Sequence, residues 1–503
     1  MGRRPVSATL PPAVIEMASP TTDMENLDIR LRADASSRQV ALRAIAFAVA
    51  WLVIGSMFGL MASFKLHMPD WLVNNAPLTF GRIRSAHLNA MAYGWASSAM
   101  LAVSVWIIPR LVHTELRVPK AAEAGLYFWN IGMVLGIYGI LGGHSDGLEW
   151  LEMPRYWADP FIVIGGGLVG LSLLSTIAMR EVSHLYVSVW YIMAAFIWFP
   201  IIYVVGNWPT FSGVESAAVN WFYAHNALGL WLTPVCVGAA YYFIPKILGR
   251  PIYSYQLSLL GFWTLGFFYS LNGMHHLIGG PLPTWMITTS IVASGLMVIP
   301  VIAVGVNQHM TLSRRFGALR YSPTLRFIVF GAVAYTLVSL QGVFMAFREV
   351  NRLTHFTHVT VAHAHLGLYS FVTMILFGSI YYILPRLLGR EWISERLISW
   401  HFWSVSIGQV VYLVPLTVSG MVQGVAMSDP GTTWQQVIQA MMPGLIGRSI
   451  GGTLLTIGHG VFAYHVWLMF RGARARQGLP PFHEVAPIIT RRDKATFIPG
   501  GVA

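Results

Sequence analysis

Long apolar runs alternate with short polar loops through most of this chain, from about residue 41 to residue 470. A helix needs about 20 apolar residues to cross a hydrocarbon core about 30 Å thick, and each run is of about that length. Twelve spans are predicted, at residues 41–64, 86–108, 122–143, 159–180, 186–206, 216–245, 254–277, 285–308, 326–348, 358–385, 397–424 and 443–470. We therefore expect an all-α integral membrane protein, a bundle of about twelve transmembrane helices.

The segments outside these runs predict little folded structure. Residues 1–39 mix Pro, Ser, Thr, Asp and Arg without a period, which is typical of a disordered or surface-lying tail. No basic stretch leads directly into a short apolar core with a cleavage site, so no signal peptide is expected. The predicted organisation is a polar tail (1–39), one membrane domain (40–471) and a basic C-terminal tail (472–503).

The charges in the loops predict the orientation. The loops after the even-numbered spans hold most of the basic residues: Arg110, Arg117, Lys120, Arg180, Lys246, Arg250, Arg314, Arg315, Arg320, Arg386, Arg390 and Arg396. The opposite loops hold most of the carboxylates: Asp70, Asp146, Glu149, Glu152, Asp159, Glu215, Glu349 and Asp429. Because Lys and Arg favour cytoplasmic loops, both termini are predicted to be cytoplasmic.

Composition supports a membrane protein and narrows its chemistry. Only 10% of residues are charged and 55% are hydrophobic, whereas about a quarter are charged in soluble domains. The net charge of +12 comes from short loops, so the expected surroundings are membrane lipid and no nucleic acid. Cys236 is the one cysteine, which excludes disulfides within the chain, iron–sulfur clusters and covalent c-type haem. Any haem must be held by histidine.

Six histidines are predicted to lie at a common depth, in the half of the membrane nearer the acidic loops: His87, His225, His275, His276, His363 and His365. His363 and His365 leave opposite faces of one helix, because residues two apart differ by about 200° in azimuth. One helix could therefore ligate two cofactors. Any single histidine could be an ordinary core residue with a hydrogen-bond partner, but six at one depth favour two haems and one further metal.

The remaining histidines carry weaker predictions. His401, His459 and His465 fall toward the inner ends of spans and are expected to be interfacial or hydrogen-bonded. His358 could support the haem carboxylates through another side chain.

At these residues the chain resembles the catalytic subunit of haem–copper oxidases of the C family, the cbb3-type cytochrome c oxidases. The resemblance runs from about Ser85 to about Phe470. Its motifs are GRIRSAH (81–87), WFYAHNALG (221–229), RPIYSYQLS (250–258), FYSLNGMHHL (268–277), VNRLTHFTHVTVAHAHLG (350–367), HFW (401–403) and SGMVQG (419–424).

The resemblance implies a role for each histidine. His87 and His365 would be the axial ligands of a low-spin haem b, and His363 the proximal ligand of a high-spin haem b. His225, His275 and His276 would hold one copper ion. In the family a tyrosine is joined covalently to the first copper histidine, and Tyr269 occupies that position here. Arg84 is the first candidate to contact a haem carboxylate, ahead of Arg82 and Arg448.

A proton path is predicted from the cytoplasmic side. Tyr255, Ser258 and Tyr269 share one face of a helix, and Thr233 lies two turns below His225. Tyr241 joins this path by resemblance only. Hydroxyls bonded to backbone carbonyls would explain the same residues equally well.

Three functions follow as hypotheses. The first is reduction of O2 to water in a bacterial inner membrane, with electrons from membrane-bound c-type cytochrome subunits and coupled proton uptake and pumping. The second is nitric oxide reduction, favoured by Gln341 where the family usually has a glutamate and opposed by Gly229 and Tyr269. The third is a colourless transporter whose histidines relay protons.

Overall fold

The computed structural model describes residues 20–475, and within them the chain is helical with no strands. The helices are α1 (Pro20–Lys65), η1 (Ala76–Leu78), α2 (Phe80–Asn89), η2 (Ala90–Ala96), α3 (Ser97–Leu111), α4 (Pro119–Gly142), α5 (Asp159–Ala178), α6 (Val187–Gly206), α7 (Gly213–Asn226), η3 (Ala227–Leu232), α8 (Thr233–Leu248), α9 (Tyr255–Tyr269), η4 (Gly273–Leu277), α10 (Thr284–Leu296), α11 (Val298–Leu312), α12 (Ala318–Tyr321), α13 (Pro323–Ala346), α14 (Arg348–Thr354), α15 (His358–His365), η5 (Leu366–Thr373), α16 (Met374–Leu388), α17 (Glu395–Met427) and α18 (Trp434–Ala475).

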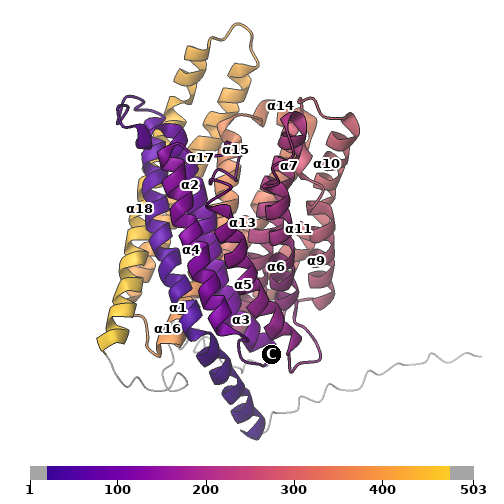
Figure 1. Ribbon diagram of the computed structural model, residues 1–503, viewed down its shortest axis with the longest axis vertical. Helices are drawn as coiled ribbons and strands as arrows, with labels where there is room; N and C mark the ends of the chain where they lie inside the picture. Colours follow the sequence, from indigo (N-terminus) through magenta and orange to yellow (C-terminus); the bar gives the residue numbers. More distant parts are fainter. Residues whose placement is uncertain (1–19, 476–503) are drawn as a thin grey trace, which may run out of the picture.

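The long helices stand side by side, roughly along one axis (Figure 1). Within the described residues, eleven helices are long and apolar enough to cross a membrane. Large apolar side chains such as Trp263, Phe267 and Leu337 are 63%, 66% and 56% exposed, as lipid-facing residues are. The predicted all-α membrane bundle is confirmed.

The count differs from twelve at one place. The predicted span 254–277 contains α9, which has only 15 residues and ends at Tyr269. The chain then turns and forms the short 3₁₀ segment η4, which carries His275 and His276. The span is short because the chain leaves the α-helix early, and this exit brings the two histidines into the bundle.

Of the predicted tail at residues 1–39, expected to be disordered or surface-lying, residues 20–39 are not disordered but belong to α1. Their polar groups have partners: Asp34 pairs with Arg110 at 2.6 Å, and the Ser36 hydroxyl accepts from the Leu116 amide at 2.8 Å. Polar composition alone does not distinguish a solvated tail from a helix whose polar groups are paired inside the fold. The first 19 residues, and nearly all of the predicted C-terminal tail, lie outside the described residues.

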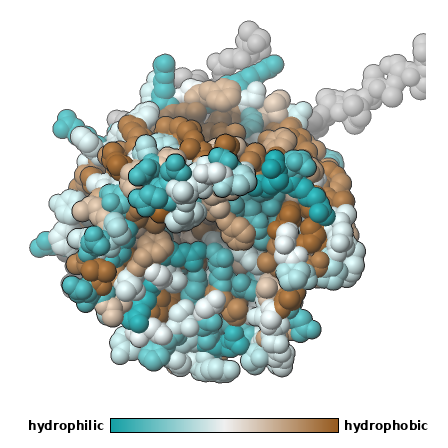
Figure 2. All heavy atoms as spheres, turned by 90° about the horizontal axis from the view of Figure 1, so that it is seen from above, coloured by the Kyte–Doolittle hydropathy of each residue, from teal (hydrophilic) through white to brown (hydrophobic). Residues whose placement is uncertain are grey.

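The two ends of the bundle differ. One end, which we call the acidic end, carries the start of α2, η4 and the start of α15, near the top of Figure 1. Viewed from above, hydrophilic and apolar side chains alternate across this face (Figure 2). The other end, the basic end, carries the end of α16 with Arg386, the loop with Arg390 and the start of α17 with Arg396.

Candidate metal centre

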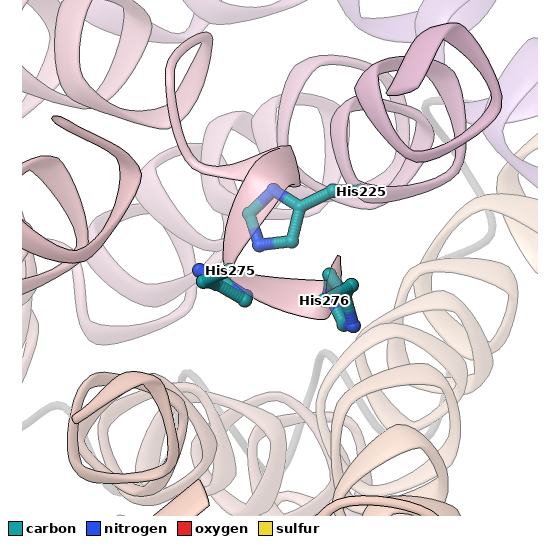
Figure 3. A group of neighbouring side chains, drawn as sticks. All are labelled: His225, His275 and His276. Carbon is teal, nitrogen blue, oxygen red and sulfur yellow. The ribbon is translucent and has the colours of Figure 1, made fainter. Parts of the chain in front are cut away.

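His225, His275 and His276, which we call the histidine trio, converge in the bundle (Figure 3). His225 comes from α7 and the other two from η4. One ligand nitrogen from each lies within 4.8 Å of the others. The ring centroids are 4.5 to 5.3 Å apart, with interplanar angles from 41° to 90°.

Neighbouring side chains fix two of these rings. The Ser294 hydroxyl lies 2.8 Å from His275 Nδ1, and the His275 amide donates to the Ser290 hydroxyl at 2.9 Å. His276 stacks on Trp221, with centroids 4.0 Å apart and planes 11° apart. Because Nδ1 of His275 is occupied, Nε2 is the nitrogen left for a metal.

The trio fits a transition-metal ion. His225 Nδ1 is buried and has no hydrogen-bond partner, and a buried polar atom without a partner is costly. Three neutral imidazoles are a donor set that suits copper, zinc, iron or nickel. The residues present therefore fit the copper site that the sequence predicted.

Tyr269 lies beside the first histidine of the trio. Its ring centroid is 4.5 Å from that of His225, and the planes are 31° apart. A Cβ atom at Gly229 would overlap the Tyr269 ring, so the glycine provides the space that the tyrosine fills. A larger residue at 229 and a tyrosine in this position exclude each other.

His87 and His365, which we call the histidine pair, face one another across a gap. Their rings are nearly parallel, 11° apart, with centroids separated by 6.3 Å. Nδ1 of His87 is bound to the Gly55 carbonyl at 2.7 Å, and Nδ1 of His365 to the Val361 carbonyl at 2.8 Å. Two imidazoles on opposite sides of one metal, each bonded through Nε2 at about 2 Å, would have centroids roughly 6 Å apart. The pair therefore fits the two axial positions of a haem iron. The Tyr412 hydroxyl is 3.2 Å from His365 Nε2.

His363 is the sixth predicted ligand. Its Nδ1 lies 3.2 Å from Gln341 Oε1, which leaves Nε2 as the ligand atom. A Cβ atom at Gly342 would be 3.1 Å from the ring. Since α15 remains α-helical through His365, the predicted opposite-face arrangement of His363 and His365 applies to the structure.

Three π-helical segments follow the ligand residues. η2 begins three residues after His87, η3 two residues after His225 and η5 directly after His365. π segments are rare and occur often at functional sites. The sequence did not predict these segments. A π segment inside a long apolar helix has the same hydropathy as the α-helix around it.

A buried carboxylate near His87 was also missed. Arg84 contacts Glu149 at 2.8 Å and Glu152 at 3.2 Å, and Asn89 donates to Glu152 at 2.8 Å. Burial raises the pKa of the Glu152 carboxyl, while the bonds from Asn89 and Arg84 oppose this shift. The sequence feature that could have indicated this site is the pair of carboxylates, Glu149 and Glu152, three residues apart in one loop.

The predicted proton-path residues lie along α8 and α9. The Tyr255 hydroxyl donates to the Leu185 carbonyl at 2.8 Å and the Ser258 hydroxyl to the Tyr255 carbonyl at 2.6 Å. The Tyr241 hydroxyl lies 3.4 Å from Asn307 Nδ2. Thr233 is half-buried at the start of α8.

Two further tyrosines, which the sequence analysis missed, have buried hydroxyls without a partner: Tyr191 and Tyr335. Tyr191 packs on Tyr241, with ring centroids 5.9 Å apart.

Comparisons with known proteins identify the family. The family model described as cytochrome c and quinol oxidase polypeptide I matches residues 39–454. The cbb3-type cytochrome c oxidase subunit CcoN1 of Stutzerimonas stutzeri is 33% identical over 444 residues, 85% of this chain and 93% of that protein. The cytochrome c oxidase subunit 1 homolog of Agrobacterium tumefaciens (strain T37) is 31% identical over 450 residues, 86% of this chain and 83% of that protein.

More distant proteins share the architecture. A nitric oxide reductase chain of Stutzerimonas stutzeri is 25% identical over 474 residues, covering 85% of this chain and 94% of that protein. A solved structure described as a heme-copper terminal oxidase dimer matches with a TM-score of 0.69 and 16% identity, covering 88% of this chain and 85% of that one. The lower identity to the nitric oxide reductase favours the oxidase interpretation. This chain therefore belongs to the cytochrome c and quinol oxidase polypeptide I family, as subunit I of a haem–copper oxidase.

Proposed function

We propose that this subunit reduces O2 to water between a high-spin haem b on His363 and one copper ion on the histidine trio. A second, low-spin haem b is held between His87 and His365. Electrons come from membrane-bound c-type cytochrome subunits, since this chain has one cysteine and cannot attach such a haem itself. Proton uptake and pumping accompany the reaction. When bound, the haem iron and the copper would supply electrons to O2.

The observation that carries this proposal is the packing of Tyr269 against His225 in the space left by Gly229. Cleavage of O2 to the oxidation level of water takes four electrons, and a phenol beside the metals can give one of these electrons together with a proton. Nitric oxide reduction breaks no O–O bond. The tyrosine and the glycine together therefore favour O2 as the substrate.

Four of the six proposed metal ligands are oriented by a hydrogen bond at Nδ1. Ser294 does this for His275, Gln341 for His363, and backbone carbonyls for His87 and His365. Such contacts fix the tautomer, so that Nε2 carries the lone pair toward the metal.

Protons reach Tyr269 along α8 and α9 through Tyr255, Ser258, Tyr241 and Thr233. The Tyr255 and Ser258 hydroxyls now donate to backbone carbonyls and would have to rotate to pass a proton. Tyr191 and Tyr335 extend the path, because their buried unpartnered hydroxyls can bind ordered water.

Arg84 contacts a haem carboxylate in this proposal and shares its charge with Glu149 and Glu152. Arg448 is a second cation for this purpose. It lies over the Tyr412 ring at 5.8 Å, and its Nε is buried without a partner. The subunit is placed in a bacterial inner membrane with both termini cytoplasmic, so that the donor subunits approach the acidic end.

Nitric oxide reduction is the second candidate. Gln341, which contacts His363 Nδ1, occupies a position where the resemblance implies a glutamate. Tyr269→Phe distinguishes the two, since it deletes only the hydroxyl. We expect near-complete loss of O2 consumption with both haems and copper retained. Peptide mass mapping should find the Tyr269 and His225 peptides covalently linked in the wild type. Tyr138→Phe, on α4 and 71% exposed, is the control. Unlinked peptides together with normal O2 consumption in Tyr269→Phe would favour nitric oxide.

A further inference from the structure

Three histidines outside the metal centre are buried in the half of the bundle nearer the basic end. His401 on α17 and His465 on α18 are fully buried, and His459 on α18 is 3% exposed. The sequence predicted them as interfacial or hydrogen-bonded, and their burial inside the bundle was not foreseen. Ionisable side chains inside a membrane bundle are costly and signal function by default.

His459 is held between two hydroxyls. Its Nδ1 lies 2.6 Å from Ser56 Oγ, and its Nε2 lies 2.5 Å from the Tyr369 hydroxyl oxygen. The Ser56 hydroxyl already donates to the Leu52 carbonyl at 2.5 Å, so it accepts from His459 Nδ1–H. Neutral His459 therefore accepts a hydrogen bond at Nε2 from the Tyr369 hydroxyl. This is the arrangement in which a tyrosine can pass its proton to an imidazole.

The other two imidazoles each have an unpaired nitrogen. His465 Nε2 accepts from the Ser394 amide at 3.3 Å, so its Nδ1 carries the hydrogen, and that atom is buried with no partner. His401 Nδ1 lies 2.9 Å from the Tyr381 hydroxyl, and its Nε2 is likewise buried and unpaired. Buried polar atoms of this kind are usually satisfied by ordered water.

Aromatic contacts join these groups into one series. The Tyr381 ring lies 6.4 Å from His465 and 5.8 Å from His401. The Phe377 ring lies 4.4 Å from His401 and 5.9 Å from His459. Gln409, eight residues beyond His401 on α17, bonds Ser370 through Oε1 and has a buried, unpaired Nε2. Water bound to the unpaired nitrogens of His401 and Gln409 would carry a proton past Phe377.

The series ends at the histidine pair. Tyr369 lies four residues after His365, about 6 Å along the helix. Ser56 follows Gly55, whose carbonyl accepts from His87 Nδ1. At its other end, Ser394 lies in the α16–α17 loop at the basic end. The series therefore runs from the basic end to the shell around His87 and His365, on helices that do not carry the α8–α9 path.

We propose that His465, Tyr381, His401, Tyr369, His459 and Ser56, the histidine column, form a second proton branch that serves the low-spin haem. This rests on the proposed function, which assigns a haem to His87 and His365. When that haem gains one electron from the donor subunit, one proton enters from the basic end. It binds Tyr369 Oη as Tyr369 passes its own proton to His459 Nε2. The resulting imidazolium donates to Ser56 and Tyr369, and oxidation reverses the transfer.

The electrostatic reason is the low dielectric of the bundle interior. An added electron on a buried cofactor is stabilised by a positive charge nearby, far more than in water. Tyr369 from η5 is hydrogen-bonded to His459, and the other titratable groups within electrostatic range of it are His87 from α2 and His401 from α17. Ser56, from α1, does not titrate. His459 is the member of this set with hydrogen bonds ready on both nitrogens and no predicted metal.

The test measures the midpoint potential of the low-spin haem against pH in the intact membrane complex, by optical redox titration. The wild-type potential should fall as pH rises. In His459→Gln and Tyr369→Phe the slope should be at least halved, and in His309→Gln it should stay as in the wild type. His309, on α11, has one hydrogen bond, to Thr336 at 3.3 Å. Tyr369→Phe removes one oxygen atom, so it serves where His459→Gln fails to fold.

His401 and His465, on the entry side of the column, should affect the rate of proton uptake and not the pH dependence of the haem midpoint potential. In His401→Phe and His465→Phe the slope should persist, while proton uptake after rapid reduction of the low-spin haem, followed with a pH dye, should slow more than tenfold. Wild-type slopes in His459→Gln and Tyr369→Phe, or a wild-type rate of proton uptake in both His401→Phe and His465→Phe, would refute the proton branch. The histidine column would then be a buried polar cluster with a structural role only. A wild type without a low-spin haem band would instead overturn the proposed function.

Discussion

The histidine trio and the histidine pair use the same side chain at the same end of the bundle but differ in geometry. The trio's rings are 4.5 to 5.3 Å apart and steeply inclined to one another. The pair's rings are 6.3 Å apart and nearly parallel. Three inclined rings can direct their lone pairs at one small ion, whereas two rings 6.3 Å apart leave space for one metal ion between them. Ring orientation, more than residue type or depth, distinguishes the two sites.

The contacts that orient the rings also differ between the pair and the trio. The pair is held by backbone carbonyls of α1 and α15, which no side-chain substitution removes directly. The trio depends on side chains, with Ser294 on His275 and Trp221 against His276. The trio should therefore be the site whose metal affinity is easier to alter from its surroundings.

The largest expected effect separates the two faces of α15. Wild-type protein should carry two protohaems and about one copper. His365→Ala should remove the low-spin haem and leave carbon monoxide binding intact, whereas His363→Ala should abolish the high-spin signal and carbon monoxide binding. Either change should reduce O2 consumption to background. Optical and carbon monoxide difference spectra measure this. If one substitution erased both haem signals in folded protein, the opposite-face assignment would be wrong.

A smaller effect is expected from the support of the trio. Ser294→Ala removes the hydroxyl that fixes His275, and loss of such a partner typically costs about 10-fold to 100-fold in metal affinity. Copper retention during dialysis against a chelator measures it, and the haem spectra should not change. Ser270→Ala is the matched control, because that hydroxyl donates only to the Phe267 carbonyl at 2.8 Å. Equal copper loss in both variants would refute the role of Ser294.

Much of this comparison was predictable from sequence. Apolar runs located the spans, and the residue spacing alone separated His363 from His365, because α15 is a regular helix through both. The grouping of His225 with His275 and His276 followed from depth and resemblance. These predictions depend on local periodicity, which the sequence states directly.

The supports of the sites were not predictable in the same way. The contact of Gly229 with Tyr269 and that of Ser56 with His459 join helices far apart in the chain. The π segment η5 has no residue type that signals it. The burial of His401 and His465 follows from the packing of α17 on α18. Such features depend on tertiary contacts, so one sequence cannot state them.

The smallest expected effect concerns charge. A buried carboxylate, Glu152, contacts Arg84 and Asn89 on α2, the helix that carries His87, whereas neutral side chains support the trio. Burial raises the Glu152 pKa above its ordinary value of 4.5. Above that ordinary value the folded chain therefore binds more protons than the unfolded chain. Stability should then fall as pH rises, until the pH passes the raised pKa.

Glu152→Gln keeps the shape of the side chain and removes the titration, so it should flatten this decline. We expect the temperature at which the low-spin haem signal is lost to fall less between pH 5 and pH 8 in the variant than in the wild type. Glu149→Gln is the control, because it removes the other carboxylate on Arg84 from a side chain that is 40% exposed, and it should keep the wild-type slope. A wild-type slope in Glu152→Gln would mean that Glu152 remains charged throughout this range. The pair would then lack the pH sensitivity that separates it from the trio.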